Sequence, residues 1–318
     1  MKYFLSIFLI LNAAVASAQL TYETLAVDYD SAIVYKNLKI IPIRAKNLAF
    51  GAHHPGRNII TLNDAIKNGI ASITERGTAS TENVHWLRIN NKSDSSIYIS
   101  SGELISGGRQ DRMVMRDTIL PPSKRDQYFQ VMCVEEERWS DKEKDFEHRG
   151  FANSHLRKVL DINKNQVQIW NEIGSQLELG HVNSKSMAYL SLRDPEPLHK
   201  RKRDPVKIPA SDEYFNYFLQ KIKQTDTSIL GIVCVSGNRI LGCDIYAGVN
   251  LFNQQLNPLL RGYIDEALLF GGPVTLPDEK VVKYMDNILM DEKTQEEFVS
   301  KNGKIFRYEK RIIHINTY

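Results

Sequence analysis

Two apolar runs separated by the short segment Ser-Gly-Asn constrain the fold more than any other feature of this sequence. The runs are SILGIVCV (228–235) and RILGCDIY (239–246), and Ser236-Gly237-Asn238 stands between them. Both runs are rich in β-branched residues, and short loops of glycine and asparagine connect antiparallel strands. The sequence therefore predicts a β-hairpin centred on Gly237-Asn238.

The same hairpin carries two of the three cysteines of the chain. Centring the turn on Gly237-Asn238 pairs Cys234 with Leu241 and Cys243 with Ile232. The two sulfur atoms then occupy non-opposed positions, so we predict no disulfide between them. Because the number of cysteines is odd, at least one thiol has no partner within the chain.

The segments before this hairpin predict mostly strands. Four of them are rich in β-branched and aromatic residues: 38–44, 84–89, 96–100 and 127–135. The turn-forming segment NNKSD (90–94) predicts that the second and third of these strands form a hairpin. Thr61 and Asp64 resemble a capping box, and Gly69 fits the end of a helix, which predicts a short helix over 62–68.

Helical patterns dominate after residue 150. The predicted helices are 154–177, where apolar residues recur with a period near 3.6, then 211–224, 258–270 opened by Pro258, and two near 277–300; a last strand is predicted over 304–315. A strand-rich first half followed by a mixed second half indicates an α+β fold. There is no repeat and no long linker, so we predict a single α+β domain over residues 19–318.

The N-terminus has the features of a cleavable signal peptide over residues 1–18. Lys2 gives a positive start, an apolar core runs from Phe4 to Val15, and Ala16-Ser17-Ala18 fits a cleavage site. The apolar core is shorter than the ~20 residues that span a membrane. An uncleaved anchor is the alternative interpretation. We expect a mature protein that begins at Gln19, without a membrane span, exported to a bacterial periplasm or secreted.

Charge and motifs exclude several functional classes. The formal net charge is +3, and removing Lys2 with the signal peptide leaves +2, too little for a nucleic-acid-binding protein. The basic run HKRKR (199–203) stands among prolines and is interpreted as a solvated loop. GELISGG approaches a phosphate-binding loop, but Gly108-Arg109 stands where Lys-Ser/Thr is required. No motif predicts a metal or a cofactor, and protein partners cannot be inferred.

Polar residues that suit a functional site gather between residues 102 and 139. Glu103 follows the apolar strand SIYIS, and the glycine pair of GGRQDR precedes two arginines. On the strand QYFQVMCVE, Glu135 shares a face with Phe129 and Val131, which places a carboxylate at a strand end. The candidate residues are Gly102, Glu103, Gly107, Gly108, Arg109, Gln110, Arg112, Cys133, Glu135, Arg138 and Trp139.

Each of these residues also has a purely structural interpretation. Gly107-Gly108 is typical of a turn or bulge, and arginine–glutamate pairs are more often structural than catalytic. Cys133 alone is more often a small buried hydrophobe than a nucleophile, and Trp139 is more often a packing residue than a stacking platform for a ligand.

These residues carry a resemblance to a known family. The strings TLNDAIKNGIASITE, GELISGGRQDR and VMCVEEERW are similar to the bacterial ARG- and rhodanese-phosphatase-superfamily-associated protein domain, in which ARG abbreviates ADP-ribosylglycohydrolase. The similarity covers about residues 38–140, and GCDIYAGVNLFNQQLNPLLRGYIDEAL continues it more faintly. The resemblance implies a link to ADP-ribose or nucleotide derivatives, but no established reaction. The chain departs from the family in carrying a predicted signal peptide. This argues against a role that depends on cytosolic NAD or ATP.

Two hypotheses follow, and the sequence leaves open whether the protein is an enzyme. In the first, the site binds or processes a small anionic ligand: Glu103 or Glu135 acts as general acid/base, Arg109, Arg112, Arg138 and Trp139 hold the ligand, Gln110 orients it, and Cys133 supports the strand. In the second, the protein is a non-enzymatic exported module and the same residues form a buried network. A shared cleft would favour the first hypothesis, and mutual burial the second.

Overall fold

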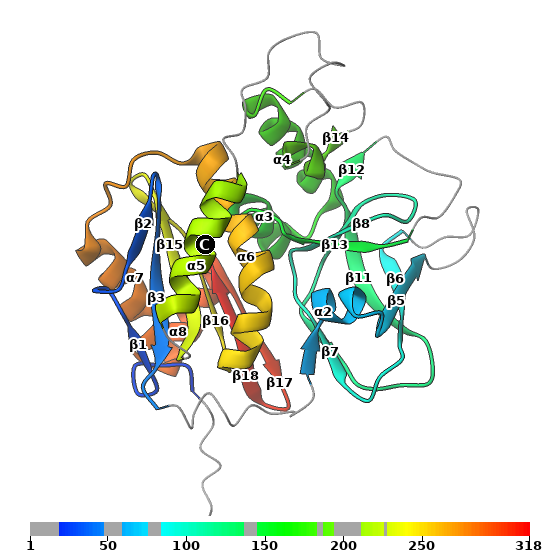
Figure 1. Cartoon of the computed structure of the whole chain (residues 1–318), viewed down its shortest axis with the longest axis horizontal. Coiled ribbons are helices and arrows are strands. Elements are labelled where there is room, and N and C mark those ends of the chain that lie inside the picture. Colours follow the sequence, from blue (N-terminus) through cyan, green and yellow to red (C-terminus); the bar gives the residue numbers. More distant parts are fainter. Residues whose placement is uncertain are drawn as a thin grey trace, which may run out of the picture.

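An antiparallel sheet of seven strands forms one lobe of the computed structural model (Figure 1). Its strands are β1 (Leu25–Val27), β2 (Ile33–Tyr35), β3 (Leu38–Ala45), β15 (Ile229–Ser236), β16 (Arg239–Tyr246), β17 (Gly303–Tyr308) and β18 (Arg311–Thr317). They pair in the order β1-β3-β15-β16-β18-β17, with β2 also on β3, so both ends of the chain build this sheet. The structure describes residues 19–47, 59–75, 84–136, 145–182, 187–193, 211–225 and 228–318.

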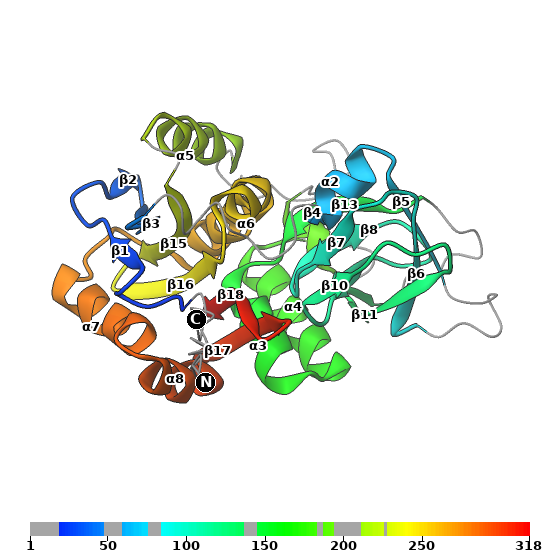
Figure 2. The same cartoon turned by 90° about the horizontal axis from the view of Figure 1, so that it is seen from below.

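Helices cover both faces of this sheet (Figure 2). On one face lie α5 (Ser211–Thr225) and α6 (Val249–Phe270), and on the other α7 (Asp278–Leu289) and α8 (Glu292–Asn302). The central strand β15 is buried along its whole length, as expected between two helical layers. Within the part of the chain that the structure describes, no helix has both the length and the apolar composition needed to cross a bilayer.

The second lobe contains two packed sheets. The six-stranded sheet has the order β13-β8-β9-β11-β6-β5, and the three-stranded sheet β10-β7-β4. The bounds are β4 (Ile59–Thr61), β5 (Ala71–Glu75), β6 (Trp86–Asn91), β7 (Ser96–Ile99), β8 (Glu103–Ser106), β9 (Arg112–Val114), β10 (Thr118–Leu120), β11 (Gln127–Cys133) and β13 (Glu147–Phe151). A two-stranded ribbon, β12 (Glu135–Glu136) with β14 (Met187–Ala188), continues into the 3₁₀ helix η1 (Tyr189–Leu192).

The six-stranded sheet has an apolar core on each face. Ile105 and Val114 contact the core shared with the small sheet and α2 (Leu62–Lys67). Their neighbours Leu104 and Met113 join the core that contains α3 (Ser154–Asn163) and α4 (Gln166–Leu179). Because successive side chains alternate across a strand, a sheet covered on both faces must be apolar at successive positions. This accounts for the adjacent apolar residues Leu104-Ile105 on β8 and Met113-Val114 on β9.

The α+β class predicted from the sequence is confirmed, as are the strands at β3, β6, β7 and β11. Thr61 caps α2 as predicted, since its Oγ1 accepts the backbone N–H of Asp64 at 3.3 Å. The predicted hairpin over 90–94 is wrong. β6 pairs with β5 and β11, so both of its edges are occupied, and β7 pairs with β4 and β10 in the other sheet.

Three predicted element boundaries also differ. The helical period over 154–177 is divided into α3 and α4 at Lys164, which adopts the left-handed conformation with φ 48°. α6 begins at Val249, and Pro258 lies buried inside it rather than at its start. Residues 304–315 form the two strands β17 and β18, because Glu309 and Lys310, with φ 49° and 65°, make a tight turn between them.

The hairpin of β15 and β16 forms as predicted, but a β-bulge shifts its register. Cys234 opposes Gly242, and Cys243 opposes Val233, one residue away from the pairing that the turn alone predicts. A Cβ atom at Gly242 would lie 2.8 Å from the carbonyl oxygen of Thr317, so the close approach of β18 requires glycine at the bulge. Cys234 and Cys243 are buried free thiols, in agreement with the prediction for this pair.

Candidate functional site

Glu103, the first residue of β8, is completely buried beside α6. Its Oε2 accepts the backbone N–H of Ser100 at 3.2 Å, and its Oε1 accepts the side-chain amide of Gln255 from α6 at 2.9 Å. Nε2 of His148, on β13, lies 3.7 Å from the same Oε1. Glu103 therefore connects the second lobe to α6 and faces a histidine.

His148 has a defined orientation next to this carboxylate. Its Nδ1 accepts the backbone N–H of Gly150 at 3.2 Å. A ring nitrogen that accepts carries no proton, so the neutral ring carries its proton on Nε2, the atom that faces Glu103. The side chain is 3% exposed, and within the described residues its Nε2 makes no hydrogen bond.

His148 also lines a pocket of about 600 Å³. The charged residues of its wall are His148, Arg149, Arg193, Arg261, Asp212 and Asp265. We call it the arginine pocket. It lies between β13, the first turn of α5 and the middle of α6. Its three arginines outnumber its two aspartates, so the wall has a positive formal charge even when His148 is neutral.

The arginines of this wall differ in how firmly they are held. Arg193 bonds to Asp265 at 2.6 Å and donates to the carbonyl oxygens of Arg149 and Phe151. Burial raises the pKa of Asp265, although Arg193 acts against the shift. The Arg261 guanidinium, in contrast, is 41% exposed and lies 3.4 Å from the exposed carboxylate of Asp212. A ligand can therefore reach Arg261.

The GGRQDR segment lies against a residue that the sequence analysis did not select. The backbone N–H of Arg109 donates to Oε1 of Glu75, at the end of β5, at 2.7 Å. Arg112 lies 3.6 Å from Oε2 of Glu75 and donates to Oε1 of Gln110 at 3.1 Å. Arg112 and Glu75 are both fully buried. Within the described residues, the polar partners of Glu103 include neither arginine.

The three glycines of GELISGGRQDR (102–112) are required by its geometry. Gly102 has φ 86°, and a Cβ there would lie 2.8 Å from Cγ of Arg157. Gly107 has φ 120°. Gly108 has φ 53°, and a Cβ there would lie 2.4 Å from Oε1 of Glu75. Positive φ values and close contacts exclude larger side chains at these positions.

Glu135 and Cys133 lie at the far end of β11. Glu135 is buried on β12, and its Oε2 accepts the backbone N–H of Asp111 at 3.4 Å. The backbone N–H and carbonyl of Cys133 both bond to the side-chain amide of Gln166, at 2.9 and 2.7 Å. Arg138 and Trp139 lie outside the described residues. The candidate residues are thus divided among Glu103 beside α6, the group of Arg109, Gln110 and Arg112 around Glu75, and the pair Cys133 and Glu135 near the end of β11.

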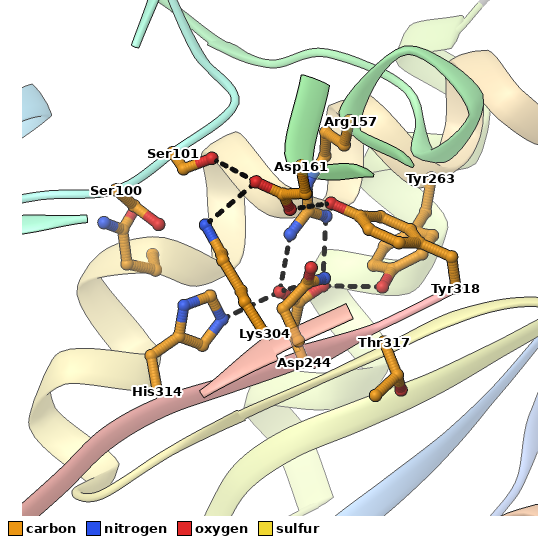
Figure 3. Close-up of polar contacts among 12 residues, drawn as sticks. Ser100, Ser101, Arg157, Asp161, Asp244, Tyr263, Lys304, His314, Thr317 and Tyr318 are labelled. Atoms are coloured by element: carbon orange, nitrogen blue, oxygen red, sulfur yellow. Dashed lines mark hydrogen bonds and ion pairs between the residues drawn. The ribbon is translucent and has the colours of Figure 1, made fainter. Parts of the chain in front are cut away.

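Asp244 on β16 is the centre of a buried polar cluster (Figure 3). Its carboxylate accepts two hydrogen bonds from Arg157 of α3, at 2.7 and 3.1 Å, and one from the hydroxyl of Tyr263 at 2.6 Å. His314 Nε2 lies 2.8 Å away, and Asn316 donates at 3.2 Å. The bidentate pair with Arg157 joins α3 to the seven-stranded sheet.

Asp117, between β9 and β10, extends this cluster into the second lobe. Nζ of Lys304, on β17, lies 2.5 Å from its Oδ2, and Ser100 donates to its Oδ1 at 3.0 Å. Nδ1 of His314 lies 3.5 Å from the same oxygen, so the imidazole stands between Asp117 and Asp244. The cluster is therefore a charged joint between the lobes.

Charges and hydrogen bonds shift the pKa values of this joint. Burial alone would raise the pKa of Asp117, but Lys304 and His314 outweigh burial and hold it well below its usual range. The pKa of Asp244 is likewise lowered against burial by Arg157 and His314. Burial alone would lower the pKa of His314, but its hydrogen bonds to the two aspartates raise it above its ordinary value.

The contribution of the joint to the free energy of unfolding is expected to be largest in mildly acidic solution. The aspartates have lowered folded-state pKa values, so their contribution is present above about pH 5 and is lost as the pH falls. His314 has a raised folded-state pKa. Its contribution is therefore present below about pH 6 and is lost as the pH rises through the folded-state pKa of His314. Urea unfolding between about pH 3 and pH 9 measures both limbs.

The variant His314→Gln is the control for this pH dependence. It should flatten the alkaline limb and leave the acidic limb in place, because both aspartates remain. An alkaline limb that is unchanged in this variant would assign the pH dependence to other groups.

Neither the arginine pocket nor the charged joint was found from the sequence. For the joint a signal exists: Asp244 interrupts an apolar strand, and His314 and Asn316 interrupt another, and polar residues in buried strands need dedicated partners. The pocket arginines belong to no shared motif, so only the structure shows that they converge.

Residues 26–317 match the family described as the ARG and Rhodanese-Phosphatase-superfamily-associated Protein domain. The match includes the segments whose motifs carry the resemblance and extends over both lobes. No curated protein and no solved structure matches the chain.

Proposed function

The chain belongs to the ARG and rhodanese-phosphatase-superfamily-associated protein domain family, and we propose that it binds a small anionic molecule in the arginine pocket. One observation carries this proposal: Arg149, Arg193, Arg261 and His148 converge on one pocket of about 600 Å³. That volume lies within the range of small-molecule sites. Guanidinium groups match phosphate and carboxylate through paired hydrogen bonds.

Glu103 supports this pocket through His148, which lines the pocket wall. Its carboxylate is held by Ser100 and Gln255, and it lies beside Nε2 of His148. The imidazole of His148 also lines the pocket, so it links the buried carboxylate to the ligand site. For Glu103 the proposal is thus a supporting role, exerted on the ligand site through His148, in place of the general acid or base that the sequence suggested.

The family description favours a nucleotide or phospho-sugar derivative, including ADP-ribose, as the ligand. It associates these domains with ARG, the ADP-ribosylglycohydrolases, and with the rhodanese-phosphatase superfamily. Ligands of this class carry phosphate groups and are large enough to occupy the arginine pocket. The predicted signal peptide lies outside the described residues, and we propose that the ligand is met in the periplasm or outside the cell.

The substitution Arg261→Gln is expected to weaken binding of this ligand at least about tenfold. The exposed guanidinium supplies charge-assisted hydrogen bonds, each worth roughly 1.5–3 kcal/mol, that glutamine cannot replace. Isothermal titration calorimetry with ADP-ribose, AMP and glucose 6-phosphate measures the effect.

Arg88→Gln is the matched control, because Arg88 is similarly exposed, at 44%, and lies 3.5 Å from its partner Asp126, away from the pocket. It should bind the ligand as the unmodified protein does. If none of the three probes binds, or if Arg261→Gln binds as tightly as Arg88→Gln, the proposal is wrong.

The burial of Arg112 favours a second role, a structural one, for the GGRQDR segment. Its guanidinium and the carboxylate of Glu75 have no exposed surface. The guanidinium also donates a hydrogen bond to Oε1 of Gln110. We propose that this group fixes the turn between β8 and β9 and binds no ligand. This corresponds to the buried arginine–glutamate network of the second hypothesis, restricted to one part of the candidate site.

A further inference from the structure

Glu266 is a fully buried carboxylate on α6 whose partners reach the surface. Its Oε1 lies 2.5 Å from Nδ1 of His155 and 2.8 Å from a terminal nitrogen of Arg239. Its Oε2 accepts the backbone N–H of His155 at 3.1 Å. Burial alone would raise the pKa of Glu266, but its bonds to His155 and Arg239 outweigh burial and lower it. The carboxylate is therefore ionised and orients two groups that are exposed to solvent.

The imidazole of His155 is fixed in one orientation. An ionised carboxylate can only accept, so Nδ1 carries the proton, and Nε2 of the neutral ring has a lone pair directed away from Glu266. The ring also stacks on Phe270, with centroids 4.2 Å apart and planes 21° apart. The side chain is 40% exposed, and its Nε2 makes no contact within the described part of the chain.

Arg239, at the start of β16, donates a hydrogen bond to the same carboxylate oxygen, Oε1 of Glu266. Its side chain is 36% exposed, and its guanidinium lies 5.9 Å from the centre of the Phe270 ring. Only one terminal nitrogen is engaged by Glu266, and the other donors make no hydrogen bond among the residues that the structure describes. His155 and Arg239 share one acceptor, Oε1 of Glu266, and both side chains reach the surface beside Phe270.

We propose that His155 and Arg239 form a second binding site, for the phosphate group of inorganic phosphate or of a phosphomonoester. Phosphate fits because it carries both oxyanions and, near neutral pH, a hydroxyl group. The oxyanions accept from the guanidinium, and the hydroxyl donates to Nε2 of neutral His155. Sulfate lacks that hydroxyl and should bind less well to the neutral ring.

This site is separate from the arginine pocket. Glu266 and its neighbour Asp265, which lines the pocket, are successive residues of α6, so they point to different sides of the helix. The proposal therefore does not depend on the proposed function, and each can fail without the other.

The test is titration of the protein with inorganic phosphate at about pH 7.5, followed by NMR of the His155 imidazole. We expect a saturable shift in the unmodified protein and in Arg261→Gln. In Arg239→Gln the apparent affinity should fall at least about tenfold, because the charged donors are lost. Sulfate should give a weaker shift, and glucose 6-phosphate distinguishes a phosphomonoester from the free ion.

A His155 resonance that does not saturate with phosphate overturns the proposal, as does an equal affinity in Arg239→Gln. A larger effect of Arg261→Gln than of Arg239→Gln would place the phosphate in the arginine pocket instead and also overturn it. Should Arg239→Gln fail to fold, Arg239→Lys retains the charge without the planar fork, and it must weaken binding for the proposal to stand.

Discussion

Replacing Asp244 with asparagine is expected to lower the free energy of unfolding by about 3–5 kcal/mol. The carboxylate is fully buried and accepts both hydrogen bonds of the Arg157 fork. Asparagine removes the negative charge and leaves the buried guanidinium without its counter-charge, which costs far more than the lost hydrogen bonds alone. Equilibrium urea unfolding at neutral pH measures the change.

Asp126→Asn is the matched control, since Asp126 is exposed and pairs with Arg88 at 3.5 Å. Exposed pairs of this kind contribute about 0–1 kcal/mol. If Asp244→Asn destabilises the protein no more than Asp126→Asn does, the charged joint does not hold the two lobes together.

Replacing Arg112 with glutamine is expected to cost a similar amount, about 3–5 kcal/mol, in the absence of any ligand. The substitution leaves the carboxylate of Glu75 without the guanidinium that lies 3.6 Å from it, in a site without solvent. Thermal and urea unfolding of the variant, compared with Arg88→Gln on β6 of the same sheet, measure this cost.

The opposite result would indicate that the GGRQDR segment binds a ligand. If Arg112→Gln keeps its stability but loses binding of the probes used for the arginine pocket, Arg112 serves the ligand and not the turn. Functional sites carry groups whose removal leaves stability unchanged or raises it, so the pair of measurements separates the two roles.

The position of Glu103 was anticipated only locally. The sequence placed it after the strand SIYIS and a glycine, and in the structure it begins the next strand, β8, buried and beside a histidine. The sequence also grouped Glu103 with Arg109 and Arg112 because the residues are close in the chain. In the structure the two arginines contact Glu75 instead. Glu75 lies far from them in the chain, so the sequence gave no reason to include it in the candidate site.

The sequence by itself determined the α+β class, the capped helix α2, the turn at Gly237-Asn238 and the family, because these depend on neighbouring residues or on local motifs. It could not determine which strands pair. The segment 90–94 has the composition of a turn, yet both edges of β6 are filled by strands from elsewhere in the chain. Strand pairing is a competition between distant segments, and local composition does not decide it.

The tertiary structure alone decided three features. These are the register of the β15–β16 hairpin beyond its bulge, the turn between β17 and β18, and the positions of the arginine pocket and the charged joint. Gly242 is needed because β18 passes close to it, and Glu309-Lys310 turns without the glycine that marks most tight turns. The arginine pocket and the charged joint are built from residues that no shared segment contains. Charges far apart in the chain acquire a common function only when folding brings them within a few ångströms, where burial and mutual attraction become strong.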